Sequence, residues 1–156
     1  MAIRGVFHAV PRSAFGATIR TTDDIARFLA GTHPVLSPAQ LDVADAWACL
    51  GALCAHFELP RVMGIEPLAI PDQLSTLYIP AYRVPGIASA LEQIGPGQLA
   101  AGMAALSAAP PADGAAWARD QRGLALMFLQ LKKLYRACAD NGYDLIFVKS
   151  KGAPGH

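Results

Sequence analysis

The sequence predicts an α+β fold in which helices cover a small mixed β-sheet, arranged as a three-layer α/β/α sandwich. Residues 3–10 alternate with a period of two and end before Pro11, which is typical of a β-strand. A second strand-like run, "YDLIFVK", occupies residues 143–149. Between them lie segments with helical periodicity, the longest running from Asp113 or Gly114 to Asn141, where Gly142 suits a left-handed C-cap.

The length and composition favour one cytoplasmic domain. A chain of 156 residues can fill a single core, so we expect one domain over residues 1–149 and a mobile tail over 150–156. The start lacks the long apolar region of a signal peptide, and no run reaches the ~18 apolar residues that a membrane span needs. Three cysteines, an odd number, fit a reducing compartment.

The charge balance argues against two classes of partner. With 13 basic and 12 acidic side chains, the formal net charge is +1. Such a chain has no strong long-range field for nucleic acid or an anionic membrane. We therefore expect neither to be a partner, and we expect recognition to depend on shape and local patches.

The central segments are assigned from turn and capping signals. Thr21 or Thr22 caps a short helix that ends at Gly31, and "SPAQ" at residues 37–40 resembles a capping box that starts a helix over residues 38–57. Residues 58–71 are expected to form a loop, with a short strand at 61–65. An edge strand is expected at 76–84, followed by helices at 85–94 and 98–107.

The expected helix at residues 38–57 raises the question of a metal or nucleophile site. One face carries Asp42, Asp45, Cys49 and His56, and the other centres on Trp47, which we expect to be a core anchor. Cys49 and His56 would lie on the order of 10 Å apart along the axis, too far for a catalytic dyad. We interpret the polar face as solvated and expect no catalytic residue, metal ligand or cofactor.

Two polar residues share one side of the first strand. Arg4 and His8 could bind an anion there, but an ordinary solvent-facing or mutually satisfied polar pair is the favoured interpretation.

The long helix near the C-terminus carries the first candidate binding surface. Its apolar stripe, from Trp117 to Cys138, should face the core. The opposite face is both basic and apolar, so it is either a docking surface or part of a helix enclosed between two layers, and burial of its leucines is slightly favoured. The candidate partner-binding residues on that face are Arg119, Arg122, Leu126, Leu129, Lys133 and Arg136.

A second candidate site is a pocket between the 58–75 loop and the 76–84 strand. Loops often collect binding residues, and carboxylates and tyrosines occur together in this region. The candidate pocket residues are Glu58, Glu66, Asp72, Tyr78 and Tyr82.

Several short motifs, taken in order, resemble those of the YfbM-like bacterial proteins, a domain family of unknown function. They are "MAIRGVF" at the start, Leu41-Asp42 and Trp47, "LYIPAYRV", and "FLQLKKLYRACADNGYDLIFV" at the end. The resemblance covers most of the chain and implies helices packed about a small mixed sheet. This chain has Gly51 where members often carry histidine, and "ELPRVMGIEPLAIPDQLS" replaces a polar, glycine-rich segment.

These observations predict a non-catalytic, cytoplasmic protein-binding module. Its partner would be another protein or a second copy, and an immunity protein that neutralises a bacterial toxin is one concrete form, suggested by analogy. The alternative is a small-molecule sensor or enzyme that uses the pocket between the 58–75 loop and the 76–84 strand. A structural role in a larger assembly is a third hypothesis.

Overall fold

A five-stranded sheet organises the computed structural model, which describes residues 3–151. The strand order is β2-β1-β5-β4-β3, and every neighbouring pair is antiparallel. The two strands nearest the ends of the chain therefore lie side by side within the sheet. The strands are β1 (Ile3–Val10), β2 (Gln40–Ala44), β3 (Glu66–Pro67), β4 (Ser75–Ile79) and β5 (Asp144–Lys151).

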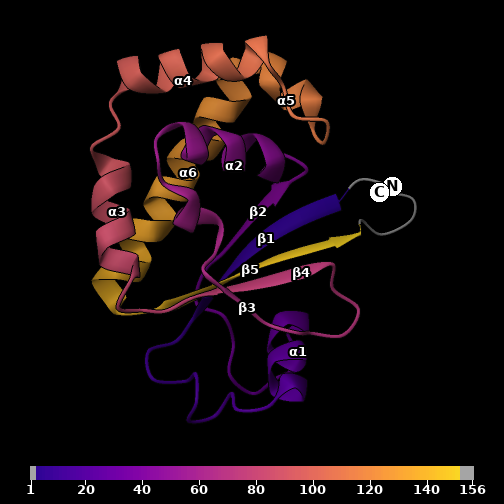
Figure 1. The fold of residues 1–156 in the computed structure, drawn as a ribbon. Coiled ribbons are helices and arrows are strands. Elements are labelled where there is room, and N and C mark those ends of the chain that lie inside the picture. The colour runs from indigo at the N-terminus through magenta and orange to yellow at the C-terminus, as the bar shows by residue number, and fades with distance from the viewer. Residues whose placement is uncertain (1–2, 152–156) are drawn as a thin grey trace.

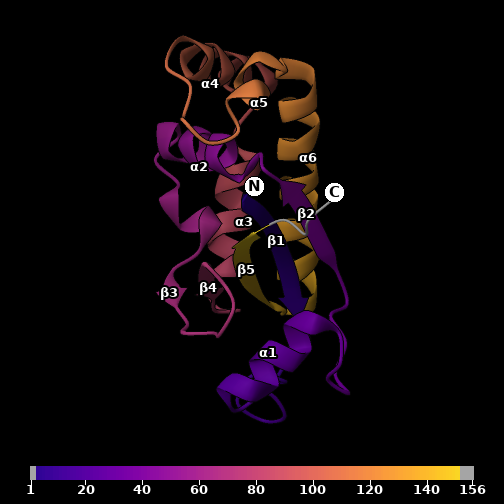
Figure 2. The same cartoon turned by 90° about the vertical axis from the view of Figure 1, so that its right-hand side faces the viewer.

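Helices cover both faces of this sheet (Figure 1). One helix, α1, lies on one face, and the remaining helices lie on the other, where α6 runs the length of the layer (Figure 2). They are α1 (Thr22–Ala30), α2 (Trp47–His56), α3 (Val84–Glu92), α4 (Pro96–Ala108), α5 (Ala115–Arg119) and α6 (Gln121–Asn141), with a 3₁₀ turn, η1, at Pro60–Met63.

The expected α+β class and its three layers are confirmed, with one difference in the sheet. The expected mixed sheet is antiparallel throughout residues 3–151, because β5 enters between β1 and β4 and runs opposite to both. β5 also continues to Lys151, so residues 150 and 151 belong to the sheet and not to a tail. The rest of the expected tail, 152–156, lies outside the described residues.

The helix expected over residues 38–57 is wrong over residues 38–46. Ser37 does not cap a helix, because its hydroxyl donates to the carbonyl oxygens of Ala9 and Ala39 at 2.6 and 2.9 Å. The chain instead pairs with β1 as strand β2 and then turns at Ala44, whose φ is +50°. Helix α2 starts only at Trp47. Tertiary pairing has overridden a local capping signal.

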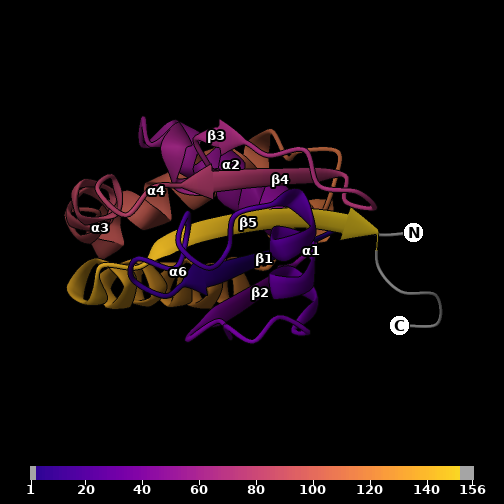
Figure 3. The ribbon, with the colours of Figure 1, turned by 90° about the horizontal axis from the view of Figure 1, so that it is seen from below.

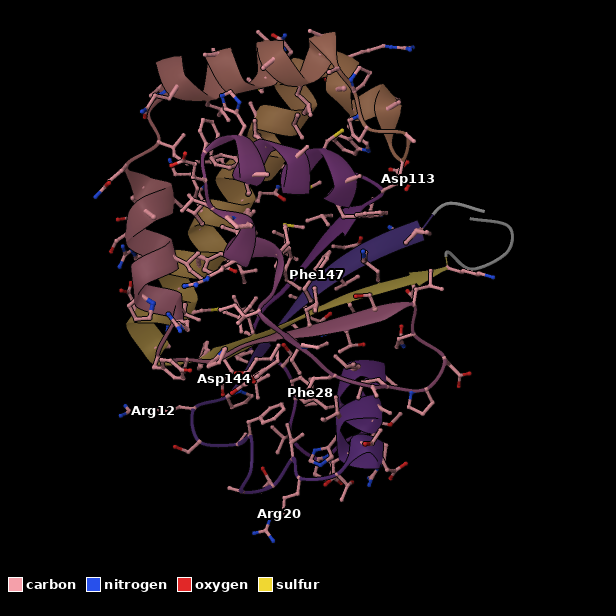
Figure 4. All side chains as sticks on the ribbon, in the orientation of Figure 1. Arg12, Arg20, Phe28, Asp113, Asp144 and Phe147 are labelled. Carbon is pink, nitrogen blue, oxygen red and sulfur yellow. The ribbon has the colours of Figure 1, made fainter. Side chains whose placement is uncertain are left out.

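The larger core lies between the sheet and the helices α2 to α6. Phe7 and Phe147 face each other across the β1–β5 pair with ring centroids 4.5 Å apart, and Tyr135 of α6 meets Phe7 edge-on at 6.5 Å. In Figure 4, Phe147 lies on this side of the sheet and Phe28 lies on the opposite side. The predicted apolar stripe of the last helix is buried here through Leu124, Phe128, Leu131, Leu134, Tyr135 and Cys138.

A smaller core lies under α1. Thr21 and Asp24 form the capping box that starts this helix, and Gly31, with a φ of +78°, ends it, as the sequence predicts. Ile25 and Phe28 are the two buried residues of α1 and pack toward β5. Seen from below, α1 crosses β1 and β5 (Figure 3). With two buried residues, this single helix covers its face more sparsely than the helical layer opposite.

Trp47 packs over the sheet but is only partly buried, so it is not the fully enclosed anchor that the sequence suggested. Its indole N–H donates to the carbonyl of Ile3 at 2.8 Å, and the Lys149 ammonium lies 4.4 Å from the ring centroid. Gly5 makes this close approach possible, because a Cβ there would lie 2.8 Å from the ring of Phe147 and 3.1 Å from the Cβ of Trp47.

The long C-terminal helical segment is divided at Asp120. The Asp120 carboxylate accepts from the amide of Gly123 and caps α6, which ends at Gly142 with the expected left-handed conformation. Leu126 and Leu129 are 56% and 45% exposed, so the slightly favoured burial of these leucines is wrong. These two leucines lie on the face of α6 opposite its buried stripe, and this face forms part of the outer surface of the protein.

A further difference concerns the loop after α2. Residues 60–63 form the 3₁₀ turn η1, where a short strand was expected at 61–65, because Pro60 starts a helical turn and cannot donate to a strand. Within residues 3–151, every helix is too short or too polar to cross a membrane.

We expect Gly64→Ala to destabilise the fold by at least about 2 kcal/mol. The φ of Gly64 is +131°, and an added Cβ would meet the Cβ of Leu77 at 2.2 Å. Gly86→Ala is the matched control, since nothing lies within 4 Å of its added Cβ and it is within α3. That control should be neutral or stabilising by up to about 1 kcal/mol. Urea denaturation would measure the change in unfolding free energy of both variants. Equal changes would contradict the crowding at Gly64.

Candidate functional site

A polar cavity of about 410 Å³ lies on the sheet face that α1 only partly covers. Its floor comes from three strands, and α1 and the loop before β4 each add one wall residue. We call it the sheet-face cavity. It is lined by Val6 and His8 of β1, Gln40 and Asp42 of β2, Val148 and Ser150 of β5, Leu29 of α1, and Gln73.

The strand register explains why these side chains meet. His8 pairs with Gln40 on one side, and Val6 lies between Asp42 and Val148. Directly opposed residues in neighbouring strands share a face, so alternate residues of three strands converge. The β1–β2 register shifts between Gly5 and Val6, which places Val43 in the larger core while Asp42 stays at the cavity. Such bulges redirect side chains.

His8 is the central polar group of the cavity. Its side chain is buried, with 7% exposure, and its Nδ1 has no hydrogen-bond partner within residues 3–151. Burial lowers the pKa of His8 from 6.5 to about 4, because the charged ring would lose its hydration. The imidazole is therefore neutral at physiological pH, with one nitrogen as donor and the other as acceptor.

Two more buried polar atoms beside the cavity lack partners. They are Oγ1 of Thr76, which pairs with Val148 across β4 and β5, and Oε1 of Gln73, within the described part of the chain. All three atoms are shielded from solvent. Buried polar atoms are normally hydrogen-bonded, so three unpaired ones near one cavity are unusual. Most of the remaining protein satisfies its buried polar groups through backbone or side-chain partners.

An ion pair lies at the edge of the cavity. Arg4 binds Asp42 through two nitrogens, each 2.9 Å from Oδ2, and both side chains are about half exposed. Arg4 and His8 do share one side of β1, as expected, but they do not form a pair with each other. Arg4 is neutralised by Asp42, whereas His8 is buried and unpaired within the described residues.

The five predicted pocket residues do not converge. Tyr78 donates to the buried carboxylate of Asp144 at 2.9 Å, and Glu66 is its cross-strand neighbour. Burial and this hydrogen bond raise the pKa of Tyr78. Tyr82 is 75% exposed, and Asp72 occupies a turn with a φ of +66°. Glu58 lines a different cavity, of about 380 Å³, with η1 and α3.

The sheet-face cavity differs from the predicted pocket, because Gln73 is its one lining residue from the 58–75 loop and the 76–84 strand contributes none. Gln73 comes from the 58–75 loop, and Thr76 comes from the following strand. Both lie beside the sheet-face cavity, but the partner residues come from β1, β2 and β5. The lining residues that were not predicted belong to no recognisable sequence motif. The period-two alternation of β1 is the sequence feature that placed His8 on one side of the strand.

The predicted surface on the last helix is present but divided. Leu126 and Leu129 are exposed, and Arg119, Arg122 and Lys133 are exposed around them. Arg136 is engaged elsewhere: its Nε lies 2.5 Å from Glu92 of α3, and its Nη1 lies 3.5 Å from Asp140. We define the α6 surface as Arg119, Arg122, Leu126, Leu129 and Lys133.

The polar face expected at residues 42–56 does not exist as one face. Asp42 belongs to a strand, Asp45 accepts from the indole N–H of Trp117, Cys49 is buried, and His56 is exposed. Among residues 3–151, no three His, Cys, Asp or Glu side chains are grouped so as to hold a metal ion. Burial raises the pKa of Cys49, and it raises those of Cys54 and Cys138 to about 12, which disfavours their thiolates.

Comparison with solved structures identifies the fold. The crystal structure of YfbM from Escherichia coli, a protein of unknown function, superimposes with a TM-score of 0.67. The match covers 94% of this chain and 99% of that one, at 16% sequence identity. This chain has the YfbM fold. The likeness at this identity concerns the fold alone, as the short sequence motifs suggested, and it assigns no activity.

The likeness to YfbM rests on the fold and on the short motifs. No family model matches the chain, and no curated protein matches it. What the cavity does must therefore be inferred from its own residues.

We expect His8 to make stability depend on pH. Because the folded-state pKa lies below that of an unfolded histidine, the unfolded chain gains a proton first as the pH falls. About 3 kcal/mol of stability should be lost between pH 6.5 and about pH 4. Arg4 and Asp42, the charged groups nearby, are present in all variants. His8→Gln should lose this part of the pH dependence in urea titrations at pH 7 and 4.5.

Replacement of an exposed histidine serves as the control. His56→Gln should retain the wild-type difference between pH 7 and pH 4.5, because His56 lies on the surface of α2. If wild type and His8→Gln lost the same stability over this range, the buried neutral state of His8 would be wrong.

Proposed function

We propose that this protein binds a small molecule in the sheet-face cavity. The observation that carries the proposal is the buried, neutral His8, whose Nδ1 lacks a partner within residues 3–151 beside a cavity of about 410 Å³. This volume falls within the ~300–1,000 Å³ typical of small-molecule pockets. The proposal develops the sensor alternative and moves its pocket to a cavity lined mainly by β1, β2 and β5.

The buried polar groups favour a ligand that can form hydrogen bonds. A buried polar atom left without a hydrogen bond costs about 1–3 kcal/mol, and three such atoms at or beside the cavity have no protein partner within residues 3–151. A bound molecule that supplies partners gains this free energy in the complex. These groups therefore favour a binding site over a purely structural strand face.

A screen of small molecules with a blocked variant would test this function. Ligands that shift the His8 ring signals in NMR spectra should lose binding in Leu29→Trp, which fills the cavity from α1. Leu36→Trp, at an exposed site away from the cavity lining, should bind normally. A broad library that produces no shift at His8, or shifts that survive Leu29→Trp, would contradict the proposal.

The α6 surface supports a second candidate function, binding to another protein. It has two exposed leucines with cations around them, which is the composition of a small interface. Arg122 and Lys133 form no ion pair with any residue in the described range. Toxin immunity is one form that such binding would take, by analogy with other small bacterial domains and without support from a particular residue.

Charge favours a different protein over a second copy as the partner. Arg122 precedes Leu126 by one turn, and Lys133 follows Leu129 by one turn. Two copies packed through the leucines would therefore place cations against cations, whether the helices run parallel or antiparallel. Like charges at an interface oppose binding, so we expect a partner segment with carboxylates around an apolar centre.

We expect Leu126→Ser combined with Leu129→Ser to abolish partner binding with a change in stability below about 1 kcal/mol. Both side chains are about half exposed, so their replacement removes little buried area. The matched control replaces Leu36 and Leu74, which are 65% and 50% exposed, with serine. Pull-down followed by calorimetry with the isolated partner would compare the two. Equal binding by both double variants would exclude the α6 surface.

A further inference from the structure

We propose that the sheet-face cavity takes an uncharged molecule with an amide-like edge, in which an N–H donor stands beside a carbonyl or ring-nitrogen acceptor. This inference rests on the proposed small-molecule function and adds the chemical class of the ligand. It follows from the charges, the hydrogen-bonding groups and the apolar walls of the cavity.

The lining offers no free charge to a ligand. Asp42 is its one carboxylate, and Arg4 already binds that group at 2.9 Å. The remaining polar lining groups are two amides, a hydroxyl and a neutral imidazole. An anion would have to compete with Asp42 for Arg4, and a cation would have to compete with Arg4 for Asp42. His8 would offer an anion a countercharge only after taking up a proton, which its burial opposes. The lining therefore favours an uncharged ligand.

The polar groups require a ligand that brings at least one donor. Oε1 of Gln73 can only accept, and it has no donor within residues 3–151. The half-buried Gln73 has three rotatable side-chain bonds, so its amide can turn toward a molecule in the cavity. A primary amide pairs edge-to-edge with another donor–acceptor edge, as glutamine does with adenine. Gln40 supplies a second amide across the floor.

The side chains of the cavity walls indicate the polarity of the rest of the ligand. Val6, Leu29 and Val148 are aliphatic, so they favour a partly apolar body over a fully hydroxylated one. Among residues 3–151, no Phe, Tyr or Trp side chain lines this cavity. Nucleobase-type heterocycles and primary aromatic amides both combine an apolar body with the required edge.

Matched pairs of probes test the class directly. Nicotinamide and nicotinate have the same ring and differ in an amide or a carboxylate, and uracil and orotate differ by one carboxylate. We expect the uncharged member of at least one pair to bind at least about tenfold more tightly by calorimetry. 1,3-Dimethyluracil, which has no N–H, should bind at least about fivefold more weakly than uracil if uracil binds.

Two variants test whether the preferred probe binds to Gln73 in the sheet-face cavity. Gln73→Leu should weaken the preferred probe by about tenfold or more, since it removes the amide without reducing the side chain's size greatly. Gln130→Leu is the control, because Gln130 is exposed on α6. Binding of uracil alone would identify a heterocycle as the ligand, and binding of nicotinamide alone would identify a primary amide. Binding of both would show that the cavity recognises the donor–acceptor edge that the two probes share.

The outcomes separate this inference from the proposed function. Equal or tighter binding of nicotinate and orotate would overturn the uncharged class. If all of these probes failed while other library members still shifted His8 and were blocked by Leu29→Trp, the class would be wrong and the binding function would stand. If no molecule of any kind reached the cavity, both would be wrong.

Discussion

The first and last strands meet in the middle of the sheet, where β1 pairs with β5 in antiparallel register from Ile3–Lys151 to Val10–Asp144. Every other layer is built on this pair. Its helix-covered side presents Phe7 and Phe147 to α6, and its opposite side presents Ile146 and Val148 to α1. Because the two strands are far apart in sequence, their pairing closes a long loop and is expected to form late in folding.

The unequal cover of the two faces follows from that arrangement. Five helices and η1 enclose one side, whereas α1 contributes only Ile25 and Phe28 to the other core as fully buried residues. The sheet extends beyond the part that α1 covers, and the remainder of this face carries the buried His8 together with the exposed Gln40 and Asp42. The sheet-face cavity therefore results from a sheet that is wider than its second helical layer.

The two sides of the sheet differ in how their buried polar side chains are hydrogen-bonded. On the helical side, buried polar groups have partners: Tyr135 donates to the carbonyl of Val62 at 2.5 Å, and Asp45 accepts from Trp117. On the side of α1, His8, Gln73 and Thr76 leave atoms unpaired within residues 3–151. The proposed ligand site rests on this contrast. The shared YfbM fold does not by itself reveal a function.

The sequence by itself determined the strands at both ends, the caps of α1 and α6, and the apolar stripe of α6, because each depends on local periodicity or on one capping residue. Only the tertiary structure decided that residues 40–44 form a strand, that Leu126 and Leu129 face outward, and that Gln73 and His8 line one cavity. These features depend on which segments become neighbours. Strand pairing can override a capping signal, and a cavity assembled from distant segments has no pattern within any one of them.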